Sequence, residues 1–173
     1  MDAIREVFGK APAEHEDWVP ADVGQTIRQS AVTALKTVWE FNTEGDPEGW
    51  GPMMGLEHFQ VRGGCMTART ATRDPAFSTH VRFDARRFDR MIVRMKLDKG
   101  TRAQLFWRPH GAGESEQTSL AFATIPDGEF HEYLLELSAV KTWQGKIMGL
   151  RLDPNSEPGA HVQIDFIRLL EKP

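Results

Sequence analysis

Turn-forming residues interrupt the chain from Leu35 onward at intervals of roughly ten residues, and this spacing restricts the fold more than any other feature. Glycine, proline, aspartate and asparagine end strands because they adopt or fix backbone conformations that a strand does not use. The segments between them are short and rich in β-formers, and none has a convincing long helical pattern. The turns stand at Gly63-Gly64, Asp74-Pro75, Asp98-Lys99-Gly100, Gly111-Ala112-Gly113, Pro126-Asp127-Gly128 and Asp153-Pro154-Asn155.

The segments between these turns predict an all-β fold, an antiparallel jelly-roll β-sandwich. In residues 91–97 every odd position is apolar, so we expect Arg94 to face away from the core. Leu150 and Leu152 likewise point inward and leave Arg151 outside. The predicted strands are Leu35–Asn42, Glu57–Arg62, Cys65–Thr70, Thr79–Asp84, Arg90–Leu97, Arg102–Arg108, Thr118–Thr124, His131–Leu137, Lys146–Asp153 and His161–Leu170.

Residues 1–33 differ from the rest and predict an N-terminal arm or linker, with residues 34–173 forming the sandwich. The arm has weak helical periodicity, and Asp22 can cap one of its one or two short helices by accepting free N–H groups. Residues 1–20 contain seven charged side chains and no apolar central segment, so they are not a signal peptide. A leader that had been removed would not be visible in this sequence, so the sequence does not identify the cellular compartment. No apolar run approaches the ~20 residues that cross a bilayer.

Composition and charge exclude several classes of protein. Apolar residues make up 40% of the chain and charged residues 27%, which excludes collagenous and low-complexity proteins. The formal net charge of −4 gives the molecule no electrostatic reason to bind nucleic acid. The single cysteine, Cys65, excludes an internal disulfide and an all-cysteine zinc site. The sequence therefore predicts a globular domain that is not held together by disulfides or by an all-cysteine zinc site.

Catalytic patterns are few in this chain. The six histidines match neither H-x-H nor H-E-x-x-H spacing, and there is no G-x-S-x-G elbow and no P-loop. Glu114 and Glu116 lie in a glycine-rich loop, where solvated side chains are expected. Tyr133, the single tyrosine and the candidate base of a lyase, alternates toward the core. The sequence favours a protein that is not an enzyme. A jelly-roll polysaccharide lyase or glycoside hydrolase stays open as an alternative, because its catalytic groups need only meet in space.

Two motifs near the ends of the β region resemble a known family. Residues 39–50 read W-x-F-x-x-x-G-D-x-x-G-W, and residues 162–169 read V-x-I-D-x-I-x-L. In this order they resemble the galactose-binding-like jelly-roll domains that occur as carbohydrate-binding modules of bacterial polysaccharide-degrading proteins. The resemblance covers residues 35–171. It implies a non-catalytic carbohydrate-binding module that is accessory to polysaccharide degradation or uptake, secreted or periplasmic, and associated with a larger multidomain protein or a catalytic partner.

The resemblance also implies a structural calcium ion where the first and last strands meet. Asp165 matches the acidic residue of the closing strand, and Asn42 stands where many members of the family have a carboxylate. Calcium takes six to eight oxygen ligands, so Glu40, Glu44 or Asp46 could restore the missing charge, and Glu44 is the further candidate ligand. The alternative interpretation is that Asp165 only forms a cap or a pair within the sandwich.

The candidate sugar site combines aromatic and polar side chains on one sheet face. Aromatic rings pack on the apolar faces of pyranoses, and charged or amide groups bind hydroxyls. In residues 102–108, Trp107 alternates to one face, and Phe106 alternates to the other beside polar neighbours. Whichever face is the core, one aromatic ring remains on the outer side. The predicted carbohydrate-binding residues are Arg94, Gln104, Trp107, Arg108, His110, Arg151 and Trp50.

Positive charge is concentrated in residues 82–108, which hold nine basic and three acidic residues. Arginine forks match carboxylate and sulfate groups, so this stretch could face an acidic polysaccharide from two adjacent strands. The alternative is a solvated face whose arginines pair across the sheet with Glu132, Glu136 and Asp153. A structural protein-interaction sandwich without sugar binding is the third functional class that the sequence leaves open.

Overall fold

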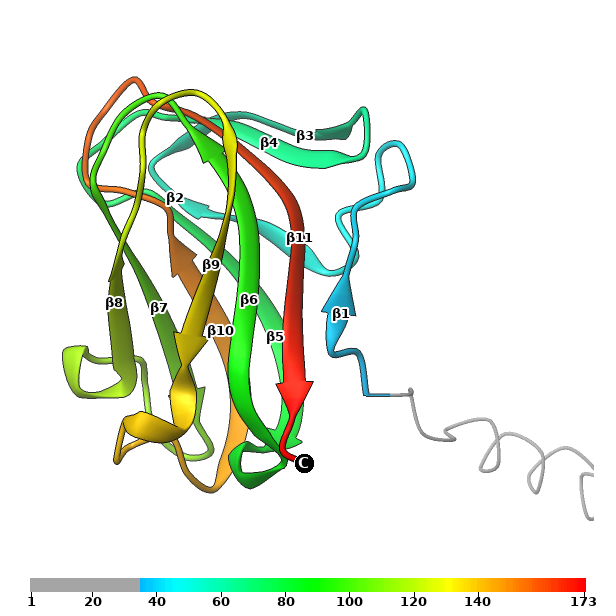
Figure 1. Cartoon of the computed structure of the whole chain (residues 1–173), viewed down its shortest axis with the longest axis vertical. Helices are drawn as coiled ribbons and strands as arrows, with labels where there is room; N and C mark the ends of the chain where they lie inside the picture. Colours follow the sequence, from blue (N-terminus) through cyan, green and yellow to red (C-terminus); the bar gives the residue numbers. More distant parts are fainter. Residues whose placement is uncertain (1–34) are drawn as a thin grey trace, which may run out of the picture. The chain divides into compact units, whose positions relative to one another are not determined.

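The structure is a computed structural model, and it describes residues 35–173; the predicted arm, residues 1–33, lies outside this part. The described chain is built from short strands joined by turns and three 3-10 turns (Figure 1). In chain order the elements are β1 (Val38–Trp39), β2 (Trp50–Met54), β3 (Leu56–Arg62), β4 (Cys65–Thr70), β5 (Ala76–Asp84), η1 (Ala85–Arg87), β6 (Phe88–Leu97), β7 (Arg102–Pro109), η2 (Glu116–Thr118), β8 (Ser119–Ala123), β9 (Phe130–Glu136), η3 (Leu137–Ala139), β10 (Lys146–Asp153) and β11 (His161–Glu171).

The strands form two antiparallel sheets that face each other (Figure 1). The six-stranded sheet has the order β3-β4-β11-β6-β9, and β1 pairs with β11. The five-stranded sheet has the order β2-β5-β10-β7-β8. The prediction of an all-β antiparallel jelly-roll sandwich is therefore confirmed. Within residues 35–173 no helix is long and apolar enough to span a membrane.

The core lies between the two sheets and follows the alternation of the sequence. The four odd positions of residues 91–97 are fully buried, as predicted, and Leu150 and Leu152 are buried opposite them. Burial of each such side chain stabilises the fold by about 1.5–3 kcal/mol. Tryptophans also pack against each other in the core: Trp107 lies edge-on against Trp143 with ring centres 5.2 Å apart. Aromatic packing thus joins the connection after β9 to the five-stranded sheet.

The structure corrects the predicted first strand. Only Val38–Trp39 pairs with β11, whereas the sequence predicts a strand over Leu35–Asn42. The backbone turns because Phe41 adopts a positive φ of 52°, and its N–H donates to the Glu48 carboxylate at 2.8 Å. A side chain therefore replaces the strand partner at this point.

Strand β2 is absent from the predicted set of strands. Its sequence contains Gly51 and Pro52, residues that are usually found in turns. Proline is tolerated here because β2 is an edge strand that pairs only with β5. The remaining strands agree with the prediction to within three residues at each end.

Candidate functional site

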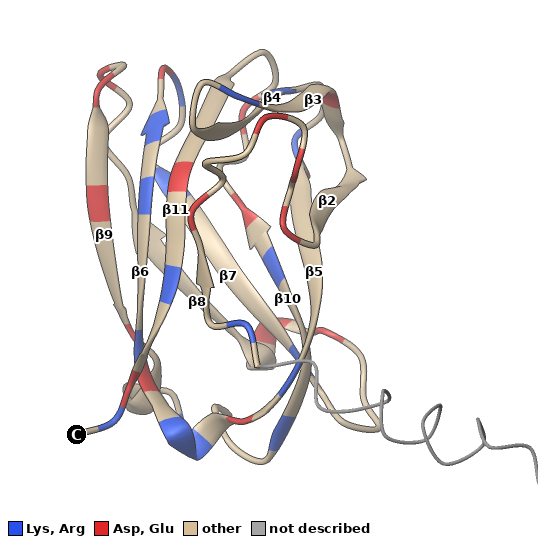
Figure 2. Cartoon of the chain, turned by 90° about the vertical axis from the view of Figure 1, so that its right-hand side faces the viewer, with Lys and Arg blue, Asp and Glu red and all other residues tan. Residues whose placement is uncertain are grey.

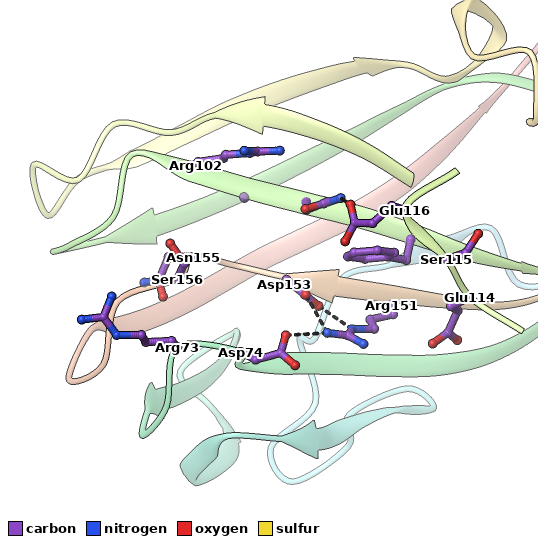
Figure 3. Close-up of a pocket in the computed structure, with 13 residues that line it drawn as sticks. Arg73, Asp74, Arg102, Glu114, Ser115, Glu116, Arg151, Asp153, Asn155 and Ser156 are labelled. Carbon is purple, nitrogen blue, oxygen red and sulfur yellow. Dashed lines mark hydrogen bonds and ion pairs between the residues drawn. The ribbon is translucent and has the colours of Figure 1, made fainter. Parts of the chain in front are cut away.

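A groove of about 640 Å³ lies on the outer face of the five-stranded sheet (Figure 3). We call it the β7–β10 groove, because these two strands form its floor. The segment before β5, the loop before β8 and the connection after β10 form its walls. Its lining residues are Arg73, Asp74, Arg102, Ala103, Gln104, Phe106, Glu114, Ser115, Glu116, Arg151, Asp153, Asn155 and Ser156.

Two cross-strand pairs form the floor of the groove. Phe106 of β7 stands opposite Arg151 of β10, and Gln104 stands opposite Asp153. All four side chains point outward because they alternate with buried leucines at positions such as Leu105. The Phe106 ring lies outside the core cluster but is only 7% exposed, since the Arg151 guanidinium covers it at 4.9 Å.

Arg151 is the centre of a charged network (Figure 3). Its Nε and Nη2 donate to the two oxygens of Asp153 at 2.7 and 2.8 Å, and Nη2 also donates to Asp74 Oδ1 at 2.7 Å. Burial raises the pKa of Asp153, and the hydrogen bond from Arg151 offsets part of that effect. The same hydrogen bond raises the pKa of Arg151. Because both carboxylates hold the guanidinium in place, its orientation is set before any ligand arrives.

The wall before β8 is tied to the floor through Gln104. The amide Nε2 of Gln104 donates to Glu116 Oε2 and to Ser119 Oγ, each at 2.8 Å. Three arginines line the groove together with four carboxylates, those of Asp74, Glu114, Glu116 and Asp153. The groove thus offers many donors and acceptors with almost balanced charge. Such a surface suits a neutral ligand that is rich in hydroxyl groups.

Two further predicted residues, at the end of β7 and in the loop after it, do not line the groove. Arg108 is on the same strand, and its Nη2 donates to Met148 O at 3.1 Å and lies 2.9 Å from His80 Nδ1. Its guanidinium lies over Gly149, where an added Cβ would come within 3.0 Å of Nη2, so glycine permits this close approach. His110 is exposed in the loop after β7. Of the predicted sugar-binding residues, the groove therefore brings together Gln104 and Arg151.

The tryptophans predicted for the sugar site lie in the core instead. Trp107 is fully buried and Trp50 is 2% exposed, so neither ring is available to a ligand in this structure. Trp107 donates its indole N–H to Thr142 O at 3.3 Å. The predicted exposure of these two rings is wrong, because both alternate toward the large space between the sheets. Phe106 is the aromatic residue of β7 that reaches the outer face.

Arg94 cannot join the other predicted sugar-binding residues. It lies on β6 in the six-stranded sheet, on the opposite side of the sandwich from Arg151. Arg94 pairs with Asp165 of β11 and covers the Phe130 ring at 4.8 Å. Basic positions of β6 lie beside an acidic position of β11 (Figure 2). Because β6 and β7 belong to different sheets, the basic stretch of residues 82–108 does not form one surface, and this expectation is wrong.

Two of the three residues predicted to hold calcium, Glu44 and Asp165, bind protein groups. Asp165 pairs with Arg94, and Glu44 Oε1 accepts the N–H of Gly63 at 2.7 Å. Within residues 35–173 no group of three histidine, cysteine, aspartate or glutamate side chains is placed to hold a metal ion. A calcium ion at Asn42, Glu44 and Asp165 would have to compete with the Arg94 cation. The calcium site therefore stays a prediction.

Sequence reasoning missed two members of the charged network as site residues. Asp153 alternates outward two positions after Arg151, and this spacing could have identified the pair. Asp74 precedes β5 and meets Arg151 only through the pairing of β5 with β10. That contact depends on the sheet order and has no local pattern.

Comparisons with known proteins bear on the fold. No family model and no curated protein matches this chain. A variant of a family 29 carbohydrate-binding module has 15% identity and a TM-score of 0.57, covering 79% of this chain and 91% of its own. Another family 29 variant, complexed with mannohexaose, has 17% identity and a TM-score of 0.58 over 77% and 89% of the two chains.

A third similar structure comes from another module family. The low-affinity xylan-binding module of family 86 from Roseburia intestinalis has 11% identity and a TM-score of 0.54, over 80% of this chain and 97% of its own. These identities are too low to transfer a function, but the similarity covers 77–80% of this chain and bears on the fold. The chain therefore has the jelly-roll β-sandwich fold of carbohydrate-binding modules.

Proposed function

We propose that this protein is a non-catalytic polysaccharide-binding module and that the β7–β10 groove holds the sugar chain. The observation that supports this most is the Arg151 network on the outer sheet face, supported by Phe106 from below and by Asp74 and Asp153 at its edges. The fold is also that of modules whose structures include a complex with mannohexaose.

The groove has the chemistry that sugar hydroxyls need. A hydroxyl both donates and accepts hydrogen bonds, and the groove presents carboxylate acceptors beside guanidinium and amide donors. Its volume of about 640 Å³ falls within the ~300–1,000 Å³ of typical ligand sites. Because Arg151 is already held by two carboxylates, little side-chain freedom is lost when a sugar binds.

The charge of the groove favours a neutral chain as its ligand. Three arginines against four carboxylates leave no net attraction for a uronate or a sulfate. We therefore propose neutral hexose or pentose polymers for this groove. We further propose that the module acts outside the cytoplasm, in a larger multidomain protein or beside a catalytic partner that degrades the polysaccharide.

Titration calorimetry with mannohexaose, cellulohexaose and xylohexaose tests the proposal. We expect at least one of them to bind, and we expect Arg151→Met to weaken that binding at least tenfold. Arg86→Met is the matched control, because Arg86 is exposed and pairs only with Asp84 in the described part of the chain. Equal affinity in both variants would overturn the assignment of the groove. Release of reducing sugars by the wild type would identify an enzyme instead.

A further inference from the structure

A second groove of about 410 Å³ lies on the outer face of the six-stranded sheet. We call it the β3–β4–β11 groove, after the three adjacent strands that line it. The two sheets pack face to face, so this groove and the β7–β10 groove lie on opposite sides of the sandwich. Its lining shares no residue with that of the β7–β10 groove, so an inference about it does not depend on the function proposed for that groove.

The strand register arranges polar side chains in rows across this groove. Gln60, Thr67 and Gln163 are direct neighbours on β3, β4 and β11, and they form the central row. Arg69 and His161 form the next row. Side chains two positions apart on a strand point to the same face about 6.6 Å from each other. The central row thus offers amide and hydroxyl groups, with a guanidinium in the row beside it.

The charge of this groove is positive, in contrast to the first. Its lining includes Arg62, Arg69 and two histidines, and no carboxylate is among the lining residues. Within residues 35–173 neither arginine forms an ion pair. Glu57 stands opposite Arg69 in the register but does not pair with it. The guanidinium donors of this groove are therefore free to bind a ligand.

Two acidic side chains beside the groove, Asp98 and Asp165, already have partners. Asp98 Oδ2 lies 2.8 Å from His161 Nδ1, and Asp98 Oδ1 accepts the backbone N–H of the same histidine at 2.8 Å. Burial alone would raise the pKa of Asp98, but the contacts with His161 outweigh this effect and lower the pKa overall. Asp165, two residues after the lining residue Gln163, pairs with Arg94. Neither Asp98 nor Asp165 pairs with Arg62 or Arg69, so Glu57, opposite Arg69 in the register, is the acidic neighbour that remains.

We propose that the β3–β4–β11 groove is a second sugar site, which binds the carboxylate or sulfate groups of an acidic oligosaccharide. Arginine binds both kinds of anion through two parallel N–H donors. The central row of Gln60, Thr67 and Gln163 gives the hydroxyl groups of the same chain their hydrogen-bond partners. Positive charge and a row of neutral polar groups together favour an oligosaccharide that bears anions.

The test is titration calorimetry on the full chain with three probes: tetragalacturonate, a carrageenan hexasaccharide and mannohexaose. The first probe carries carboxylates, the second sulfates and the third no charge. We expect one or both acidic probes to bind, and we expect Arg62→Gln/Arg69→Gln to weaken that binding at least tenfold. The double variant Lys141→Gln/Lys146→Gln removes the same charge at exposed sites outside the groove and should bind like the wild type. Binding should also weaken as salt rises.

A second variant guards against a folding defect. Gln60→Glu is nearly isosteric and places a carboxylate on an exposed position of the central row. It should lose the acidic probe while its melting temperature and its affinity for any neutral probe stay unchanged. The proposal is overturned if the wild type binds neither acidic probe, if Gln60→Glu binds one as well as the wild type, or if the lysine control loses as much affinity as the arginine variant. Arg151→Met tests the other groove separately.

Discussion

The guanidinium carbon of Arg151 lies 4.9 Å from the centre of the Phe106 ring, and the two residues face each other across β10 and β7. A cation over an aromatic face contributes about 0.5–2 kcal/mol, depending on how well it is shielded from water. This contact explains why a phenylalanine on the solvent side of a sheet is only 7% exposed. The ring supports the guanidinium from below, and the two aspartates fix its edges.

Phe106 and Trp107 are neighbours in the chain with opposite roles, and their alanine variants should separate stability from binding. Trp107→Ala removes a fully buried ring and should cost about 3–5 kcal/mol of unfolding free energy. Phe106→Ala should cost less, because its ring lies outside the core cluster, but it should weaken neutral oligosaccharide binding. Urea unfolding and calorimetry measure the two effects. A Phe106→Ala variant with unchanged affinity would contradict the role of the ring.

The pairing of Arg151 with Asp153 should make stability depend on pH in a defined direction. Burial raises the pKa of Asp153, so the folded state binds this proton more tightly than the unfolded state does. Falling pH through the folded pKa therefore favours folding at this group. Arg151→Met removes the opposing hydrogen bond and should raise this pKa further. Its stability deficit should be about 1–3 kcal/mol at pH 7, because the carboxylate loses its hydrogen-bond donor, and should shrink toward pH 4.

The matched control for this pH dependence is Arg151→Met combined with Asp153→Asn. Asparagine has no titrating carboxyl, so the double variant should show no such recovery at low pH. Melting curves between pH 4 and 8 provide the comparison. A deficit that is equally large at both ends of this range would contradict the explanation.

Glu40 and Arg168 should show the opposite sign. The hydrogen bond from Arg168, with N–O distances of 2.7 and 2.9 Å, holds the pKa of Glu40 below its usual range. A lowered pKa stabilises the fold above the unfolded value, and that stability is lost as pH falls through the folded value. Both side chains are partly exposed, so the effect should stay below about 1 kcal/mol. Carbon-detected NMR titration should show a higher pKa for Glu40 in Arg168→Met than in the wild type.

Calcium binding at Asn42, Glu44 and Asp165 is tested by melting curves. If an ion binds there, added calcium raises the melting temperature by mass action and EDTA lowers it. The same ion would have to displace Arg94 from Asp165, so Arg94→Met should strengthen the response. Asp165→Asn serves as the control without the acidic ligand. Melting temperatures that do not respond to calcium or to EDTA, in the wild type and in Arg94→Met, would exclude the site.

Strands could be predicted from the sequence wherever one face of the strand packs in the core and the other face contacts solvent. Residues 91–97 alternate strictly because β6 faces the core with one side only, and their burial follows the prediction. Strand β2 was not predicted, because it is a short edge strand and an edge strand tolerates Gly51 and Pro52. The turn at Phe41 was not predicted either, because it depends on the Glu48 side chain, seven residues further along the chain.

The candidate site was less predictable, because it depends on which sheet each strand joins. β6 and β7 follow one another in the chain, yet β6 pairs with β11 and β9 while β7 pairs with β10 and β8. Alternation places Arg94 and Arg151 outside correctly, but it does not distinguish two outer faces. The choice between Phe106 and Trp107 likewise depends on which side of β7 meets the other sheet.

The pairing of β1 with β11 has a mechanical consequence. Val38 stands opposite Arg168 in an antiparallel register, so residues 35–173 enter and leave the sandwich at the same end of this strand pair. Tension between those two ends would load the backbone hydrogen bonds in succession, as in a zipper, because they run perpendicular to the strands. β1 has two register pairs, whereas β11 is held on both sides by β4 and β6. A pulled domain should therefore release β1 at low force and keep the rest of the sandwich intact.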